Sequence, residues 1–341
     1  MGIPNNSRLN LFSKWPHGKY NLITDVLGVK VGHITIKDNN INTGVTALLP
    51  HEGNIFLDKV MAGASIINGF GKSIGIIQIE ELGTIETPII LTNTLSIGTA
   101  FTALSKYMLK ENPDIGVKTG TVNCLITECN DGRLNDIRGF HVEEKHVYEA
   151  IDKAGIIFDE GAVGGGTGMC CLGLKGGIGS SSRLVKIDDT EYTIGALVMA
   201  NFGEAGNLVI GGKHYDTNEC SINKKDQGSI IIIIATDIPL SERQLKRVAK
   251  RATISLARTG SYCGNGSGDI AIAFTTANRL PHYSDRNIMN FKMFYDENID
   301  MVFEATVEAV EESIVSALYH AETITGIRNT TAIGLQDFLH Q

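Results

Sequence analysis

The chain has 341 residues, of which 43% are hydrophobic and 20% charged, a composition typical of a soluble globular protein. Its formal net charge of −8 at pH 7 argues against nucleic acid or an anionic membrane as a partner, because neither attracts an acidic surface. No apolar run approaches the roughly 20 residues of a membrane helix, and the N-terminal segment lacks an apolar core of signal-peptide length. We therefore expect a cytoplasmic protein with no membrane partner.

Short apolar runs bounded by glycine dominate the first two thirds of the chain. They are rich in isoleucine and valine, which suit a pleated surface covered on both sides, so they predict strands of buried sheets. The clearest of these segments are residues 64–71, 73–83, 88–94 and 193–203.

Helical patterns appear at residues 97–112 and 142–155, and more clearly near the C-terminus. Residues 241–260 open with Ser241 and with Gln244 three positions on, a capping box, and apolar residues then recur at helical spacing. Residues 301–326 carry a second apolar face. Four of its glutamates predict a solvated face rather than a site: Glu304, Glu308, Glu311 and Glu312.

Strand-rich stretches are followed by helix-rich ones, which indicates a layered α+β fold rather than a doubly wound parallel sheet. The sequence has no repeat and no long linker, so we expect one domain over residues 1–341. The most linker-like segment is the polar stretch 213–228.

No metal or cofactor motif is present. The six cysteines lie at positions 124, 129, 170, 171, 220 and 263 without a CxxC pair, so we interpret them as reduced structural thiols. The glycine-rich segment 160–183 fails as a dinucleotide fingerprint because position 169 is Met169. It fails as a P-loop because Lys175 is followed by Gly176. The glycines predict tight turns beside a site, or room for a substrate near main-chain donors.

Two serines stand at suggestive positions. Ser267 and Asp269 are two residues apart before an alternating strand pattern, so on an extended chain they share a face, although Ser-Gly-Asp is also common in turns. Ser229 follows a polar loop and Gly228, and precedes five isoleucines. It is either a plain strand entry or a cleavage point. In the second case its new α-amino group, with a pKa of about 8, could accept a proton.

Seven blocks of the sequence together resemble the family of L-aminopeptidase D-amidase/D-esterases and β-peptidyl aminopeptidases. The blocks occur in one order through most of the chain: residues 23–33, 93–101, 128–137, 161–183, 200–203, 227–237 and 264–274. The resemblance implies a four-layer α/β/β/α sandwich, layered like the N-terminal-nucleophile hydrolases but connected differently. It also implies self-cleavage between Gly228 and Ser229, giving an α-chain of residues 1–228 and a β-chain of residues 229–341.

The resemblance also implies roles for individual residues. It casts Ser229 as the nucleophile, with Ser267 and Asp269 as the supporting hydroxyl and carboxylate. Asn201 corresponds to the amide that stabilises the oxyanion, and Glu128 to the acid that holds the substrate's free amine.

Two positions depart from the family pattern. Arg133 stands where several relatives have an aromatic residue, which would add positive charge beside the amine-binding pocket. Asp269 stands where some relatives have glutamate, which shortens the reach of the carboxylate.

The function implied is that of a self-cleaving serine aminopeptidase or amidase. It would release N-terminal residues from short peptides, amides or esters through an acyl-enzyme and would need no metal or cofactor. Alternatives are an amidase for non-peptide amides, an acyltransferase, or an uncleaved binding protein without activity. Because the family tends to form homo-oligomers, often tetramers, a homo-oligomer is the expected assembly. A small peptide or an aminoacyl amide is the expected substrate.

Overall fold

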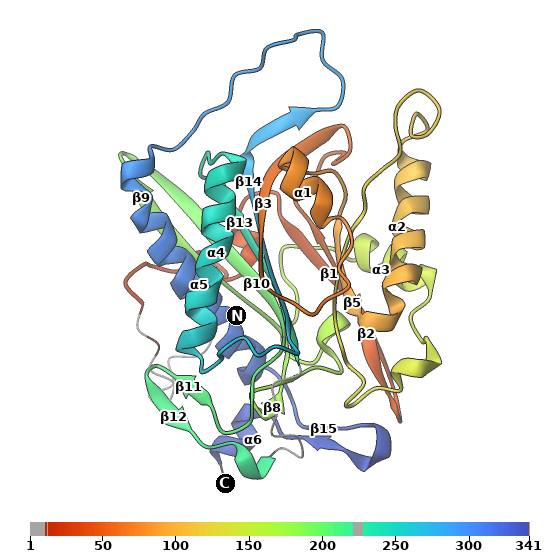
Figure 1. The fold of residues 1–341 in the computed structure, drawn as a ribbon, viewed down its shortest axis with the longest axis vertical. Coiled ribbons are helices and arrows are strands. Elements are labelled where there is room, and N and C mark those ends of the chain that lie inside the picture. The colour runs from red at the N-terminus through yellow and green to blue at the C-terminus, as the bar shows by residue number, and fades with distance from the viewer. Residues whose placement is uncertain (1–10, 12, 221–227, 341) are drawn as a thin grey trace.

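Two β-sheets form the centre of the molecule (Figure 1). The computed structural model describes residue 11, residues 13–220 and residues 228–340. The larger sheet has six strands in the order β4 (Thr84–Ile85), β3 (Asp58–Gly69), β14 (Gly268–Pro281), β13 (Ser229–Thr236), β10 (Thr190–Asn201) and β9 (Gly177–Ile187). The smaller sheet has four, in the order β1 (Lys30–Asp38), β2 (Ile41–Leu49), β5 (Ile89–Asn93) and β6 (Leu125–Cys129).

Helices cover the outer face of each sheet. Helices α4 (Glu242–Arg258) and α5 (Asp300–Tyr319) pack on the six-stranded sheet, at the left of Figure 1. Helices α2 (Ile97–Glu111) and α3 (Glu144–Asp152) pack on the four-stranded sheet, at the right. The layers therefore follow the order α/β/β/α, as the resemblance implied.

The five consecutive isoleucines of β13 are explained by its place between two cores. Ile230, Ile232 and Ile234 lie in the core beneath α4 and α5, whereas Ile231 and Ile233 lie in the core between the sheets. All five are fully buried. Each contributes about 1.5–3 kcal/mol of hydrophobic free energy, so this strand is a rigid element from which to present Ser229.

The remaining described elements are short. They are α1 (Ile76–Leu82), α6 (Leu335–Leu339), β7 (Cys170–Cys171), β8 (Leu174–Lys175), β11 (Leu208–Ile210), β12 (Lys213–Tyr215), β15 (Ile324–Thr325) and β16 (Thr331–Ala332). Among the described residues, no helix is both long enough and apolar enough to cross a bilayer. None of the six cysteines takes part in a disulfide.

Two expectations from the sequence were wrong. Residues 73–83, predicted as a strand, contain helix α1, which is bounded by Gly75 and Gly83 with φ of +95° and +65°.

The expected solvated face of α5 is largely buried. Within it, Arg183 of β9 is paired with Glu308 (Nε to Oε2, 3.2 Å) and with Glu312 (Nη2 to Oε2, 2.6 Å). Glu311 is also buried, while Glu304 remains about half exposed, with 45% of its side chain in solvent.

Candidate active site

Three strands of the six-stranded sheet meet at Ser229. Strand β13 begins at this residue, β14 begins beside it and β10 ends beside it. In the antiparallel pairing Ser229 lies opposite Asn201, and in the parallel pairing it lies opposite Gly268. The sheet register therefore brings together the segments that the sequence analysis had linked by resemblance alone.

The Ser229 hydroxyl lies against the peptide group that precedes it. Its Oγ donates a hydrogen bond to the carbonyl oxygen of Gly228 at 2.7 Å. The main-chain N–H of Gly268 donates both to Ser229 Oγ at 3.2 Å and to the Gly228 oxygen at 3.2 Å. The carbonyl of Gly228 thus accepts two hydrogen bonds and is polarised where the hydroxyl could attack it.

Residue 228 has no room for a side chain. A Cβ built there would lie 1.9 Å from the carbonyl oxygen of Asn201 and 2.6 Å from Cα of Phe202. Both atoms belong to the backbone and cannot turn aside. Glycine is therefore required at this position for the end of β10 to pass so close to the Gly228–Ser229 bond.

Ser267 and Asp269 are held together, as their spacing predicted. Ser267 Oγ donates to Asp269 Oδ1 at 2.5 Å, and both side chains are buried. They flank Gly268, whose N–H contacts Ser229. Because the Ser267 proton is directed to the carboxylate, the lone pairs of its oxygen are left to accept a proton or a hydrogen bond from another group.

The side chain of Asn201 is fixed at both ends. Its Oδ1 accepts from the main-chain N–H of Cys170 at 2.9 Å, and its Nδ2 donates to the carbonyl oxygen of Asn130 at 3.1 Å. A carboxamide nitrogen carries two N–H donors. One donor is therefore committed to Asn130, and the second is left for a ligand.

Glu128 reaches the site from the other sheet, at the end of β6. Its carboxylate is buried and accepts from the main-chain N–H of Lys72 at 2.8 Å and from the Thr94 hydroxyl. A Cβ built on Gly71 would lie 3.7 Å from Glu128 Oε1 and 3.8 Å from Cα of Gly268. Gly71 therefore leaves open the space between this carboxylate and the strand that contacts Ser229.

The negative charges of several carboxylates act on the buried thiol of Cys129. Burial raises the pKa of its thiol well above the ordinary value, and the charges of Glu128, Asp269 and Asp131 raise it further. The charges of all three acids therefore act on the same buried region, and their negative potential favours a positively charged group there. Asp131 was missed by the sequence analysis, although it stands in the block 128–137. Burial raises its pKa to about 6.

Arg133 lies beside Cys170. Its guanidinium contacts the Cys170 thiol, and together with Thr331 these residues line a small cavity. Arg133 thus lies beside Cys170, whose N–H binds Asn201, and its expected effect on the amine-binding pocket stays a prediction.

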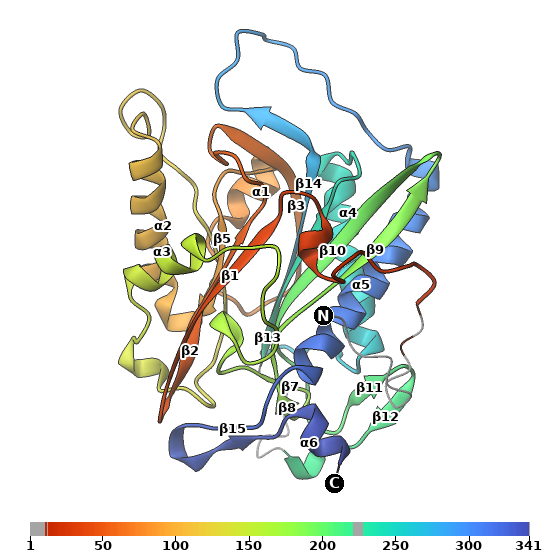
Figure 2. The ribbon, with the colours of Figure 1, turned by 180° about the vertical axis from the view of Figure 1, so that it is seen from behind.

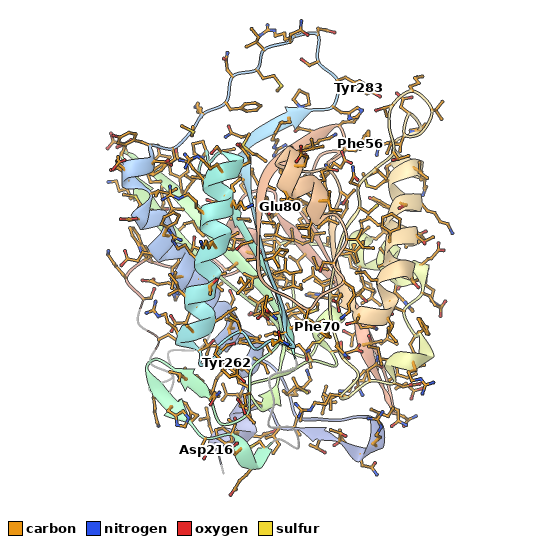
Figure 3. The ribbon with its side chains drawn as sticks, in the orientation of Figure 1. Phe56, Phe70, Glu80, Asp216, Tyr262 and Tyr283 are labelled. Atoms are coloured by element: carbon orange, nitrogen blue, oxygen red, sulfur yellow. The ribbon has the colours of Figure 1, made fainter. Side chains whose placement is uncertain are left out.

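Two exposed aromatic residues lie at the same end of the sheet, as Figure 3 shows for Phe70 and Tyr262. Each exposes 61% of its surface. Phe70 bonds through its N–H to the Ser267 carbonyl, and the Tyr262 hydroxyl donates to Glu204 at 3.0 Å. Phe70 therefore stands beside Ser267, and both rings are open to solvent.

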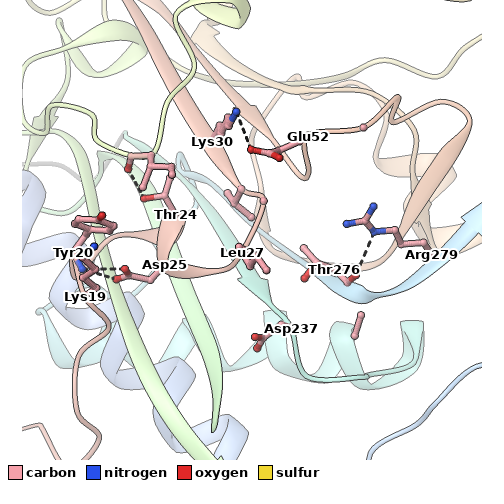
Figure 4. Close-up of a pocket in the computed structure, with 15 residues that line it drawn as sticks. Lys19, Tyr20, Thr24, Asp25, Leu27, Lys30, Glu52, Asp237, Thr276 and Arg279 are labelled. Carbon is pink, nitrogen blue, oxygen red and sulfur yellow. Dashed lines mark hydrogen bonds and ion pairs between the residues drawn. The ribbon is translucent and has the colours of Figure 1, made fainter. Parts of the chain in front are cut away.

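A separate cavity of about 760 Å³ lies at the opposite end of β13 (Figure 4). Leu27, Asp237 and Thr276 are among its lining residues. At about 3.3 Å per residue, the length of the strand separates this cavity from Ser229 by more than 20 Å, so it is not part of the same site. Among the described residues, no group of three or more His, Cys, Asp or Glu side chains could hold a metal ion.

The fold and the sequence together define a serine aminopeptidase, a hydrolase built on a variant of the N-terminal-nucleophile fold. Residues 21–332 match the model of peptidase family S58, so the chain belongs to this family.

Curated and solved relatives support this assignment. β-Peptidyl aminopeptidase BapA of Sphingosinicella microcystinivorans is 37% identical, over 92% of this chain and 85% of its own. The PH0078 protein of Pyrococcus horikoshii OT3 is 53% identical with a TM-score of 0.93, over 98% of this chain and 96% of its own. The L-aminopeptidase D-Ala-esterase/amidase of Ochrobactrum anthropi, described as a prototype of the serine aminopeptidases, is 38% identical with a TM-score of 0.88, over 96% and 94%.

Proposed function

We propose that the chain cleaves its own Gly228–Ser229 bond and that Ser229, once N-terminal, is the nucleophile of an aminopeptidase. The observation that carries this proposal is the contact of Ser229 Oγ with the preceding carbonyl oxygen, at 2.7 Å. The same oxygen accepts the Gly268 N–H. A nucleophile and a donor for the developing oxyanion are thus already assembled around one peptide bond.

In maturation, Ser229 Oγ forms a bond to the Gly228 carbonyl carbon, and the C–N bond of the peptide breaks. The nitrogen leaves as the α-amine of Ser229, and Gly228 is held as an ester on the hydroxyl oxygen. Water then hydrolyses the ester to a Gly228 carboxylate and a free hydroxyl. The products are chains of residues 1–228 and 229–341, which remain packed as one domain because β10, β13 and β14 pair across the cleavage point.

In turnover, the freed hydroxyl attacks the carbonyl of a substrate's N-terminal residue, the bond from that carbonyl to the leaving amine or alcohol breaks, and the acyl group stays on Ser229 Oγ. The α-amine of Ser229 and the Ser267–Asp269 pair move the protons, because the first is a base near neutral pH and the second offers an acceptor. The available N–H of Asn201 and the Gly268 N–H stabilise the oxyanion. Water then releases the acyl group.

The substrate is a short peptide, amide or ester with a free amine. Glu128 binds its ammonium group, supported by the field of Asp131 and Asp269. Charge-assisted hydrogen bonds of this kind contribute about 1.5–3 kcal/mol each. The curated relatives are named as β-peptidyl aminopeptidases, so the proposed range includes β-aminoacyl as well as α-aminoacyl compounds.

The test is Ser229→Ala. The unaltered protein is expected to give two bands on denaturing electrophoresis, the smaller beginning at Ser229. The variant should remain a single chain of 36.8 kDa and hydrolyse none of a panel of L-, D- and β-aminoacyl amides. Cleavage or turnover by the variant would show that another residue is the nucleophile. A single uncleaved band from the unaltered protein would contradict self-processing.

A further inference from the structure

A buried ammonium group lies beside the candidate site without any role so far. Lys175 of β8 is fully buried, and its Nζ donates to the carbonyl oxygens of Gly176 at 2.6 Å, Met169 at 2.8 Å and Gly166 at 3.2 Å. These bonds use all three of its N–H donors. Burial lowers the pKa of Lys175 to about 8, so the group is still mostly protonated at pH 7.

One of these acceptors belongs to the peptide group that holds Asn201. The carbonyl of Met169 and the N–H of Cys170 are the two ends of the same peptide bond. Its oxygen accepts from Lys175, and its N–H donates to Asn201 Oδ1 at 2.9 Å. Figure 2 shows the hairpin of β7 and β8, which contains Cys170 and Lys175, beside the lower end of β13. An unbroken chain of hydrogen bonds thus runs from the ammonium to the carboxamide of Asn201.

Such a chain of hydrogen bonds strengthens the N–H donor at its far end. A cation at the carbonyl of an amide withdraws electron density from its nitrogen, which makes the N–H a stronger donor. The Cys170 N–H, strengthened in this way, withdraws electron density from Oδ1 of Asn201. The remaining N–H of the Asn201 carboxamide becomes a stronger donor in turn. Because the chain is buried, water does not screen these effects as it would at the surface.

We propose that Lys175 is a positioning residue for the oxyanion site, holding and polarising the Met169–Cys170 peptide that orients the carboxamide of Asn201. The proposal rests on the function proposed above for Asn201. Lys175 does not touch the substrate. Its charge makes the remaining N–H of Asn201 a better partner for a negative oxygen, so it favours the transition state over the bound substrate.

A double-mutant cycle of Lys175→Met and Asn201→Ala tests the proposal. Turnover of an aminoacyl amide is measured per molecule of cleaved protein, with the first-order rate of self-cleavage followed in parallel. We expect Asn201→Ala to lower kcat by ~100-fold or more, as loss of an oxyanion donor does. Lys175→Met should lower kcat ~10-fold with KM changed less than about twofold, and the double variant should be no slower than Asn201→Ala alone.

Arg183→Met provides a matched control, because Arg183 is also a fully buried cation but bonds to Glu308 and Glu312. It should lower thermal stability and leave kcat unchanged. If Lys175→Met does not unfold cooperatively, Lys175→Gln replaces it, since glutamine keeps a donor and loses the charge. The same loss of kcat is then expected.

A normal kcat in the Lys175 variant, or an equal loss with and without Asn201, would overturn the positioning role and leave the proposed function intact. A normal kcat in Asn201→Ala would overturn the oxyanion role of Asn201 and the positioning role of Lys175 with it, whereas the role of Ser229 as nucleophile is tested separately by Ser229→Ala.

Discussion

Gly228→Ala probes the closest backbone approach in the site. The added Cβ would lie 1.9 Å from the Asn201 carbonyl oxygen and 2.6 Å from Cα of Phe202. Ordinary contact is about 3.5 Å, so the end of β10 and the cleavage point must separate by roughly 1.5 Å. Overpacking of this kind costs about 1–3 kcal/mol. Because a misplacement of about 1 Å can slow a reaction ~100-fold, we expect self-cleavage to slow by at least that factor.

The assay is a time course on denaturing electrophoresis, fitted to a first-order rate. The matched control is Gly98→Ala in α2, where an added Cβ meets no atom within 4 Å. It should cleave at the normal rate, and its free energy of unfolding should rise by about 0.5–1 kcal/mol, because alanine is more favourable than glycine in a helix. Thermal unfolding of Gly228→Ala combined with Ser229→Ala measures the packing cost without cleavage. A cleavage rate within threefold of normal in Gly228→Ala would refute the geometric argument.

Two further predictions concern buried carboxylates. Glu128→Gln should raise KM for aminoacyl amides ~10- to 100-fold with little change in kcat or in self-cleavage, since only a substrate brings a free amine to the site. Steady-state kinetics measure this, and an unchanged KM would exclude Glu128 from amine binding. Burial raises the pKa of Glu160 from 4.5 to about 7. Its contribution to stability is therefore complete below pH 4.5 and declines by roughly 3 kcal/mol as the pH rises through 7. Glu160→Gln, which keeps an acceptor for the Ser180 N–H, should remove this decline. Urea unfolding at pH 5 and pH 8, in the Ser229→Ala background, measures the free energy of unfolding with and without Glu160→Gln. An equal decline in both proteins would contradict the prediction.

Much of the site's geometry could be read from sequence spacing. The separation of Ser267 and Asp269 by one residue predicted that they share a face, and the structure adds the hydrogen bond between them. Ser267 itself ends a turn that begins at Gly264, directly before β14. The isoleucine run predicted a buried strand from Ser229 onward. The layer order followed from the family resemblance, not from the pattern of apolar residues, since periodicity does not show which sheet faces which.

The error at residues 73–83 has a local cause. The run from Ile76 to Leu82 is short and rich in isoleucine, and periodicity alone does not separate a short buried strand from a short helix. Ile77 and Leu82 are 85% and 64% exposed in the helix, whereas Ile79 is buried, so only part of the apolar run that suggested a strand lies in the core. The two flanking glycines, which end the helix on each side, were the more informative signal.

The buried charges were missed for a different reason. Glu308 and Glu312 stand in a regular helical pattern that would normally face water. Their partner, Arg183, is more than a hundred residues away on β9, and nothing in the local pattern indicates the pairing. The sequence analysis considered Lys175 only as a P-loop lysine and missed its burial, because its acceptors are main-chain carbonyls, which carry no side-chain signature.

The same strand ends serve both steps of the proposed reaction. Before cleavage, the Gly228 carbonyl occupies the position between Ser229 Oγ and the Gly268 N–H that a substrate carbonyl must occupy afterwards. The new Gly228 carboxylate must therefore withdraw before any substrate binds, and it leaves a site already shaped around an acyl group. A substitution at Gly228 should consequently slow self-cleavage alone. A substitution at Gly268 or Asn201 should slow both self-cleavage and substrate hydrolysis, because those donors remain in place after the bond is cut.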